Sequence, residues 1–278
     1  MYKDLIVATT GHGDDAAAFS TACALAAGDG GHVAVLVQVR VPLPDGGGIG
    51  LFPAEAFVAL YEEVHRQGVE NRDHWEEALR RSGVAGEVRL VEDVLSSPPQ
   101  TATFQARYTD LAVIGLGRQG ELPVDVHDQL AKMLTGSGRP LIAVSRGAKP
   151  PPYRRILVGW RAGANAARAV HDALPLLRRA DAIDVLCIDP RTDEGGTGAD
   201  PCTDIARHLG RHGLPVAVHV EVSGGDEPGA VLLRKARTLG ADLLVMGGYG
   251  HSRLREWALG GTTRHVLANA ALPVFLSH

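Results

Sequence analysis

A short glycine-rich segment near the C-terminus combines residue types and a spacing that suit the binding of a phosphate group. The apolar run at residues 243–246 is short enough to be a buried strand, and Gly247 and Gly250 follow it. After nine further residues come Gly260, Gly261 and Thr262. Backbone N–H groups can approach an anion closely at glycine, which has no Cβ, and a helix N-terminus adds unpaired donors and a positive dipole end. The segment therefore predicts a phosphate site built from a strand, a glycine loop and a helix.

Three polar residues inside the glycine loop are candidate ligand contacts. Ser252 could donate a hydrogen bond to a phosphate oxygen, and His251 or Arg253 could add positive charge beside it. The alternative is that these three are exposed loop residues, and that the glycines serve only tight turns between a strand and a helix.

The chain alternates short apolar runs with helical patterns, and this order occurs twice. Three consecutive prolines at residues 150–152 separate the two sets, and such a run cannot pair within a central strand. We therefore place one domain at residues 1–148 and a second at residues 152–278. Alternating strands and helices favour parallel sheets covered by helices on both faces. The expected strands lie at residues 5–8, 32–39, 87–91, 110–115 and 140–145, and then at 155–159, 183–188, 215–222, 243–247 and 273–276.

The spacing Gly247-x2-Gly250-x9-Gly260-Gly261 resembles the nucleotide loop of the universal stress protein (UspA) family, which is written G-x2-G-x9-G-[S/T]. The resemblance covers nearly the whole chain as two tandem domains. It implies an α/β fold of two Rossmann-like (adenine nucleotide alpha hydrolase-like) domains, each a five-stranded parallel sheet flanked by helices. It also implies that the last strands of the two domains, near residues 141–145 and 274–276, face each other in an intramolecular pseudo-dimer.

The same resemblance implies that the second domain binds ATP or a related adenine nucleotide, with Mg²⁺ as a candidate companion. Backbone groups at Ile188 match the place where the family holds adenine. Arg161 stands where the family has an aspartate; its guanidinium cannot accept hydrogen bonds, but it could stack on adenine or pair with a phosphate. Gly261 stands where the family has a small hydroxyl residue, and Thr262 could supply that hydroxyl from the next position.

The first half carries a glycine pattern that we interpret as a coincidence. Gly115, Gly117 and Gly120 spell G-x-G-x-x-G after an expected strand. A dinucleotide fingerprint belongs to the first strand–helix turn of its fold, whereas this pattern follows the fourth strand and Pro123 comes soon after it. Thr10 stands where the family has its aspartate. We therefore interpret the first domain as a degenerate universal stress protein domain with a structural or regulatory role.

Composition argues against several classes of function. The formal net charge of -4 gives no basic excess for binding DNA. No apolar run approaches the roughly 18 residues that would span a membrane. Cys23, Cys187 and Cys202 form no CxxC pair, and Cys23 and Cys187 lie in apolar patterns typical of buried thiols. Free thiols favour a reducing, cytoplasmic location.

No residue pattern indicates catalysis or a metal site. The 12 histidines are scattered, without the spacing of a paired metal site. The sequence therefore favours a cytoplasmic ATP-binding stress-response module with no assigned catalytic residue. Two alternatives stay open: a weak nucleotide hydrolase, in effect a slow ATPase, and a dimerising scaffold that binds no nucleotide. A homodimer of the tandem chain is a further expectation from the resemblance.

Overall fold

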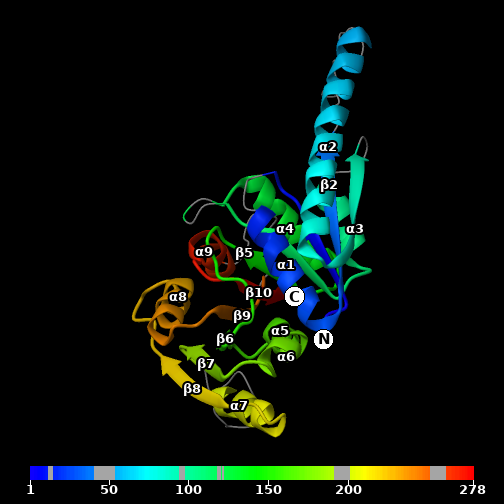
Figure 1. The fold of residues 1–278 in the computed structure, drawn as a ribbon. Coiled ribbons are helices and arrows are strands. Elements are labelled where there is room, and N and C mark those ends of the chain that lie inside the picture. The colour runs from blue at the N-terminus through cyan, green and yellow to red at the C-terminus, as the bar shows by residue number, and fades with distance from the viewer. Residues whose placement is uncertain are drawn as a thin grey trace.

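A computed structural model describes residues 1–11, 15–40, 54–93, 98–117, 120, 122–190, 201–250 and 261–278. Strands and helices alternate in two successive sets (Figure 1). The first set is β1 (Asp4–Ala8), α1 (Asp15–Asp29), β2 (His32–Arg40), α2 (Ala54–Ser82), β3 (Ala85–Asp93), α3 (Pro98–Ala106), β4 (Leu111–Gly115), α4 (Val124–Gly136) and β5 (Leu141–Val144). The second set is β6 (Arg155–Gly159), α5 (Ala164–Asp172), α6 (Leu174–Leu177), β7 (Ala182–Ile188), α7 (Pro201–Arg211), β8 (Val216–Glu221), α8 (Pro228–Leu239), β9 (Leu243–Gly247), α9 (Gly261–Asn269) and β10 (Val274–Ser277).

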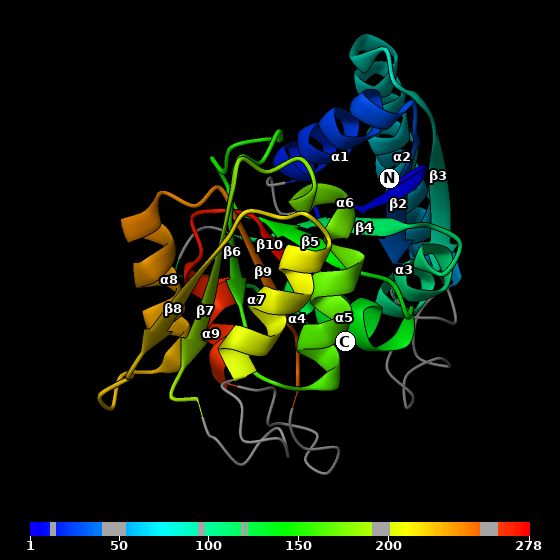
Figure 2. The same ribbon diagram turned by 90° about the horizontal axis from the view of Figure 1, so that it is seen from below.

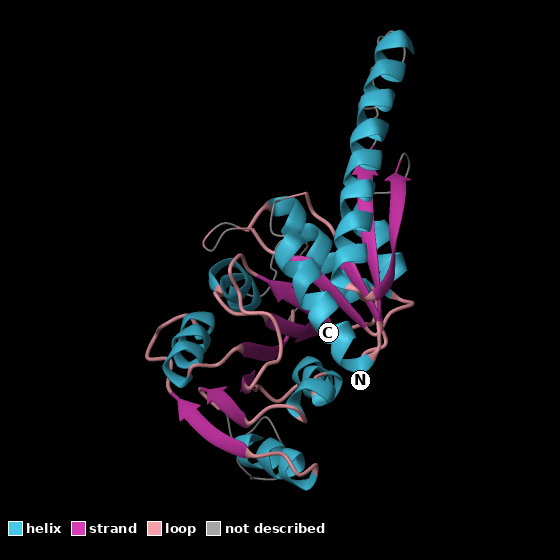
Figure 3. Ribbon diagram, in the orientation of Figure 1, coloured by secondary structure: helices cyan, strands magenta, loops and turns pink. Residues whose placement is uncertain are grey.

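The strands of the described residues form one continuous ten-stranded sheet (Figure 3). Its order is β3-β2-β1-β4-β5-β10-β9-β6-β7-β8. Neighbours are parallel within each half, and the halves meet at the antiparallel pair β5–β10, where Ile142 lies opposite Phe275. The predicted parallel sheet in each half and the facing last strands are confirmed. The two five-stranded sheets are joined into one because the edge strands β5 and β10 pair.

Helices cover both faces of the sheet, and each face has its own apolar core. One face of the sheet carries α1, α2, α5, α6 and α7, and the other carries α3, α4, α8 and α9. Figure 2 shows the same arrangement turned by 90°. Because β5 and β10 run antiparallel, the carboxyl ends of the strands in the two halves point to opposite edges of the sheet. The predicted domain boundary, between residues 148 and 152, falls in the connection between β5 and β6.

Local sequence accounts for many element bounds. The residues of β4 are buried along its whole length, as an apolar run packed on both faces requires. Glu227 caps the N-terminus of α8: its side chain accepts a hydrogen bond from the Gly229 N–H, and Pro228 is the first residue of the helix. It ends at Gly240, where φ is 67°, a left-handed conformation that glycine adopts without strain.

The helical sequence pattern over residues 164–179 forms two helices in the structure. α5 ends at Asp172, and the short α6 follows with Pro175 in its first turn. In a continuous helix Pro175 would have no N–H to donate, and its ring would clash with the carbonyl of His171. The proline therefore ends α5 early.

Two of the three cysteines are joined in a disulfide, so the prediction of a free thiol at Cys187 is wrong. Cys187 in β7 is bonded to Cys202 in the first turn of α7, with the Cα atoms 6.2 Å apart. Cys23 is buried and unpaired, as expected. The two bonded cysteines are 15 positions apart, and only the fold brings the start of α7 beside the end of β7. The disulfide removes the argument from free thiols for a cytoplasmic location.

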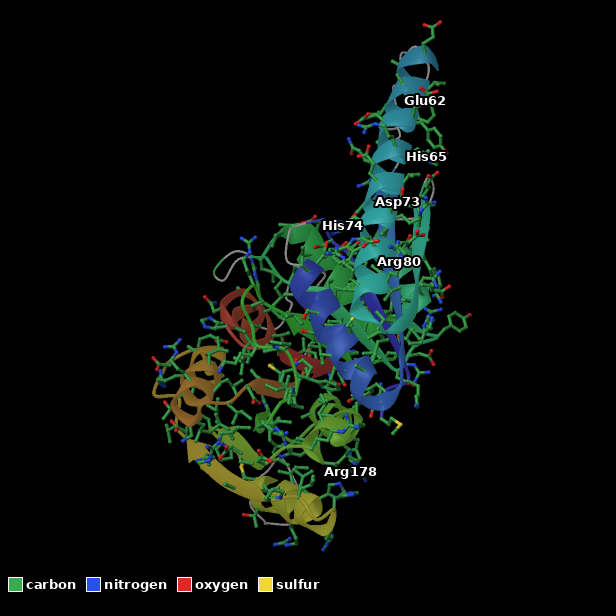
Figure 4. All side chains as sticks on the ribbon, viewed as in Figure 1. Glu62, His65, Asp73, His74, Arg80 and Arg178 are labelled. Carbon is green, nitrogen blue, oxygen red and sulfur yellow. A yellow bond between two sulfur atoms is a disulfide. The ribbon has the colours of Figure 1, made fainter. Side chains whose placement is uncertain are left out.

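α2 is the longest helix among the described residues. It has 29 residues and projects well beyond the sheet (Figure 1). Charged side chains, including Glu62, His65, Asp73 and Arg80, run along it (Figure 4). Ion pairs one turn apart, such as Arg66–Glu70, support an exposed helix by a few tenths of a kcal/mol each. Its inner part packs on the core, through Gly68 against Val39 and through Trp75 and Leu79.

Candidate functional site

The neighbouring strands β6 and β9 continue into helices on opposite faces of the sheet. β6 leads into α5, which packs on the face that also carries α1 and α7, while β9 leads to α9 on the other face. A crevice therefore opens between the two connections at the carboxyl ends of these strands, where open α/β sheets bind their ligands. A pocket of about 520 Å³ lies in this crevice.

The pocket brings together segments that are far apart in the sequence. Six of the ten residues predicted from the sequence to bind a ligand line it: Arg161, Ile188, Gly247, Gly250, Gly261 and Thr262. His251, Ser252, Arg253 and Gly260 lie outside the described residues. That any of these residues contacts a nucleotide stays a prediction.

Gly247 has no room for a side chain because the backbone of α5 lies against it. A Cβ at Gly247 would stand 2.6 Å from the backbone nitrogen of Ala166 and 2.8 Å from the carbonyl carbon of Asn165. The next residue, Gly248, donates its N–H to the carbonyl of Ser277 at 2.9 Å. Its carbonyl accepts a hydrogen bond from Nδ2 of Asn165 at 2.7 Å. These contacts hold the start of the glycine loop against the N-terminus of α5.

The N-terminus of α9 forms another wall of the pocket. The first N–H groups of a helix have no acceptor inside the helix, and the helix dipole makes this end positive. Thr262 and Thr263 line the pocket at this point. Thr263 is buried, and its hydroxyl accepts a hydrogen bond from the Tyr249 N–H at 3.3 Å. This wall therefore has the polarity to receive an anion.

A carboxylate lies beside the N-terminus of α9. Glu227 accepts a hydrogen bond from the Gly229 N–H through Oε2, at 2.7 Å, and its Oε1 lies 3.7 Å from where a Cβ of Gly261 would be. His265 Nδ1 is 3.6 Å from Glu227 Oε2. The negative charge opposes an anion at this end of the pocket, since like charges repel across a few ångströms.

The end of β7 forms a third wall, from Ile188 and Asp189. Asp189 has a φ of 46°, and its carboxylate accepts a hydrogen bond from the Ser223 N–H at 2.9 Å. Hydrogen bonds from Ser223 hold the pKa of Asp189 below its usual value, so this carboxylate is ionised at neutral pH. The Cys187–Cys202 disulfide ties the same wall to α7.

Sequence reasoning missed several residues of the pocket. Asn165, Leu232 and Met246 line it without having been predicted. Asn165 carried a usable signal, because it is a polar residue in the first turn of the helix that follows the first strand of its half. Leu232 and Met246 carried none, since their apolar patterns are those of ordinary core residues.

The corresponding crevice of the first half lies between β1 and β4. There, the side chain of Asp15 accepts hydrogen bonds from the donors of the turn after β1. The Asp15 carboxylate accepts hydrogen bonds from the Thr10 N–H at 2.9 Å, the Thr10 hydroxyl at 3.0 Å and the Gly11 N–H at 2.9 Å. Asp15 is itself buried. In the G-x-G-x-x-G pattern, residues 118 and 119 lie outside the described residues, and the Gly120 N–H donates to the carbonyl of Ala268 at 2.6 Å.

Fold and crevice together define a tandem pair of doubly wound α/β units whose second unit has an open pocket at its switch point. The sequence profile of the universal stress protein family matches residues 152–278. The C-terminal half of the chain therefore belongs to the universal stress protein family. No curated protein matches the chain.

Solved structures resemble the chain over nearly its full length. A universal stress protein from Archaeoglobus fulgidus DSM 4304 has a TM-score of 0.71 at 16% identity, covering 98% of this chain and 95% of its own. A putative universal stress protein from Pseudomonas aeruginosa UCBPP-PA14 has a TM-score of 0.62 at 18% identity, with 99% and 93% covered. A functionally unknown protein from Pseudomonas aeruginosa PAO1 has a TM-score of 0.60 at 18% identity, with 99% and 92% covered. These likenesses confirm the tandem fold predicted from the sequence.

Two further findings concern the part of the chain that the structure describes. None of its helices combines the length and the apolar character needed to cross a membrane. Its His, Cys, Asp and Glu side chains form no group of three or more that is placed to hold a metal ion.

Proposed function

We propose that the C-terminal half binds ATP, or a related adenine nucleotide, in the pocket between β6 and β9, and that the chain acts as a stress-response or regulatory module. One observation carries this proposal: Gly247, Gly250 and the N-terminus of α9 converge on a single pocket at the switch point of the sheet. Backbone N–H groups and a positive helix end are what a phosphate chain needs. The volume of about 520 Å³ lies in the range of small-ligand sites.

The walls of the pocket carry both apolar and polar groups. Ile188, Leu232 and Met246 offer apolar surface that suits the flat face of a purine base. The N-terminus of α9 suits the phosphates. Arg161 lines the pocket as well, and its planar guanidinium can stack on a base or form paired hydrogen bonds with a phosphate. A Mg²⁺ ion would accompany the nucleotide through its phosphate oxygens.

The proposal is for a binding module, and the hydrolase and scaffold alternatives are tested alongside it. A cytoplasmic location and a homodimer of the tandem chain stay predictions. The intramolecular pairing of the halves through β5 and β10 is part of the fold.

Calorimetric titration of the full-length chain with ATP, adenosine and GTP tests the proposal. We expect one ATP per chain, weaker binding of adenosine because it lacks phosphates, and weaker binding of GTP because the base differs. Mass spectrometry of the denatured protein should detect co-purified adenine nucleotide. No heat with ATP, together with no co-purified nucleotide, would favour the scaffold. Steady release of phosphate from bound ATP would favour the hydrolase.

A further inference from the structure

Tyr249, in the middle of the glycine loop, holds a backbone conformation that tyrosine seldom adopts. Its φ is 54°, and among the described residues only Asp189 and Tyr249 have a positive φ without being glycine. Both adjoin the pocket, Asp189 as a lining residue and Tyr249 between Gly247 and Gly250, which line it. A bulky residue remains in this region of backbone space only when its surroundings fix it there. Something must therefore hold Tyr249.

Part of the surroundings of Tyr249 belongs to the other half of the chain. Its ring packs on the apolar core that contains Leu130, Met133 and Leu134 of α4, and it meets the ring of His127 edge-on at a centroid distance of 6.5 Å. Leu134 also packs on the neighbouring residue, since a Cβ at Gly248 would lie 2.5 Å from its Cδ2. Figure 1 shows α4 beside the central strands where the two halves meet.

The contact between α4 and Tyr249 contains polar atoms but no ion pair. Within the described part of the chain, the Tyr249 hydroxyl, His127 Nε2 and Gln129 Nε2 are buried without a hydrogen-bond partner. Burial raises the pKa of Tyr249, and burial, followed by the charge of Arg264, lowers the pKa of His127. Both rings are therefore neutral at physiological pH, and they contribute packing rather than an ion pair.

Movement of Tyr249 would be passed to the pocket through the backbone. The Tyr249 N–H donates to the hydroxyl of Thr263, which lines the pocket at the start of α9. Gly250, the next residue, lines the pocket too. We infer that α4 of the first half positions the glycine loop of the second half, through Leu134 and Tyr249, and thereby controls the ligand affinity of the pocket. The effect on affinity rests on the proposed nucleotide function, whereas the positioning itself does not.

The first experiment needs no ligand. Hydrogen–deuterium exchange of a peptide covering residues 246–250 is compared in the parent chain, Leu134→Ala and Tyr249→Gly. We expect exchange on the order of tenfold faster in both variants, because the loop amides lose their support. Leu25→Ala is the matched control: it removes the same atoms from the first half, but from α1 on the opposite face of the sheet. Unchanged exchange in both variants, or an equal rise in Leu25→Ala, would overturn the inference.

The second experiment measures ATP affinity by calorimetry in the same variants, after circular dichroism has verified the fold. We expect ATP affinity on the order of tenfold lower in Leu134→Ala and in Tyr249→Gly. The variant that combines these two substitutions should lose no more than the sum of the two single losses in binding free energy. The conservative variant Tyr249→Phe should bind ATP as the parent does. Parent-like affinity in both single variants would refute control of the pocket by α4. If the parent chain binds no ATP, the proposed function fails, and the exchange experiment alone decides whether α4 positions the loop.

Discussion

The crevices of the two halves share a backbone plan and differ in what fills them. In each half, the residue after the first strand donates its N–H to the neighbouring strand: Thr9 to Leu36 at 3.1 Å, and Trp160 to Leu186 at 2.9 Å. In the first half, Asp15 then takes up the donors of the following turn. In the second half, the matching turn lines a pocket of about 520 Å³.

The residue that follows β4 in the first half also differs from the residue that follows β9 in the second half. Leu116 N–H bonds to Val144 at 2.8 Å, and Gly248 N–H bonds to Ser277 at 2.9 Å, so the two residues occupy equivalent places. The leucine is buried in the core of the first half, whereas the glycine has no side chain. The same fold therefore places different side chains around its two crevices: a carboxylate accepts the turn donors in the first half, and a pocket lies in the second.

The largest expected effect comes from placing a charge in the open crevice. In Gly261→Asp, a carboxylate would stand at the N-terminus of α9, a few ångströms from the proposed phosphates. At an effective dielectric near 20 the repulsion is about 4 kcal/mol, and solvent screening reduces it. We expect ATP affinity at least about tenfold lower by calorimetry.

Gly210→Asp is the control for that charge, since a side chain at Gly210 meets no atom within 4 Å and lies in α7, outside the pocket. It should bind ATP as the parent does. Parent-like affinity in Gly261→Asp, with an unchanged circular dichroism spectrum, would mean that the glycines are turn residues only.

The next effect concerns the crevice of the first half, between β1 and β4. Asp15→Ala removes a buried carboxylate that accepts three hydrogen bonds from Thr10 and Gly11. We expect the free energy of unfolding, from urea denaturation, to fall by about 2–3 kcal/mol because buried donors lose a charged acceptor. ATP affinity should stay within about twofold, as Asp15 is outside the pocket. If the variant instead bound a second equivalent of ATP, the first half would be a blocked site rather than a degenerate one.

A smaller effect is expected at Glu227, which lies beside the open crevice. Glu227→Gln removes a negative charge near the N-terminus of α9 while an amide oxygen can still cap α8. We expect ATP affinity to rise about threefold, since a partly solvated charge near the phosphates is worth roughly 1 kcal/mol or less. Asp226→Asn is the control, because that carboxylate pairs with Arg234 at the surface. An unchanged affinity in Glu227→Gln would place the phosphates away from α9.

The last expected effect is a difference in acid stability between the halves. In β7, Asp184 is buried, with Arg155 Nε at 3.0 Å and His219 Nε2 at 2.8 Å, whereas Ala34 occupies the corresponding place in β2. Burial would raise the pKa of Asp184, but the hydrogen bonds from His219 and Arg155 outweigh it and hold the pKa below its usual value. The stabilisation is therefore present at neutral pH and is lost as the pH falls below about 4.

Asp184→Asn tests this difference by thermal unfolding across pH. At pH 7 the variant should be less stable than the parent by about 1 kcal/mol, and the gap should shrink towards pH 3. Asp181→Asn is the control, because the carboxylate of Asp181 pairs with the exposed Arg154 at the surface. It should show no such trend. A gap that stays constant with pH would mean that Asp184 is not ionised in the folded protein.

The fold was predictable because its strands correspond to short apolar runs separated by segments that contain glycine and proline. β4 is buried along its whole length, and β9 is buried in all but its last residue, as their apolar sequences predict. The pairing of β5 with β10 followed from the resemblance of the halves to paired domains rather than from either strand alone. Pro175 marked the end of α5, but a periodic pattern on both sides of it concealed the break.

The site was only partly predictable. Gly247 and Gly261 stand out in the sequence because of their type and spacing, and both line the pocket. The contact of α4 with Tyr249 joins residues about 120 positions apart, and nothing local to either residue indicates it. The same holds for the Cys187–Cys202 bond and for the carboxylate of Glu227 beside α9, which depend on how distant segments meet.

The antiparallel pairing of β5 with β10 has a consequence for stoichiometry. Two identical subunits joined through such a seam would be related by a two-fold axis, so every substitution would appear twice and the two crevices would have to match. In this chain the two partners are covalently one molecule, and each can change without the other. If the proposed function holds, one half binds the nucleotide and the other supports it, so that each chain binds one nucleotide.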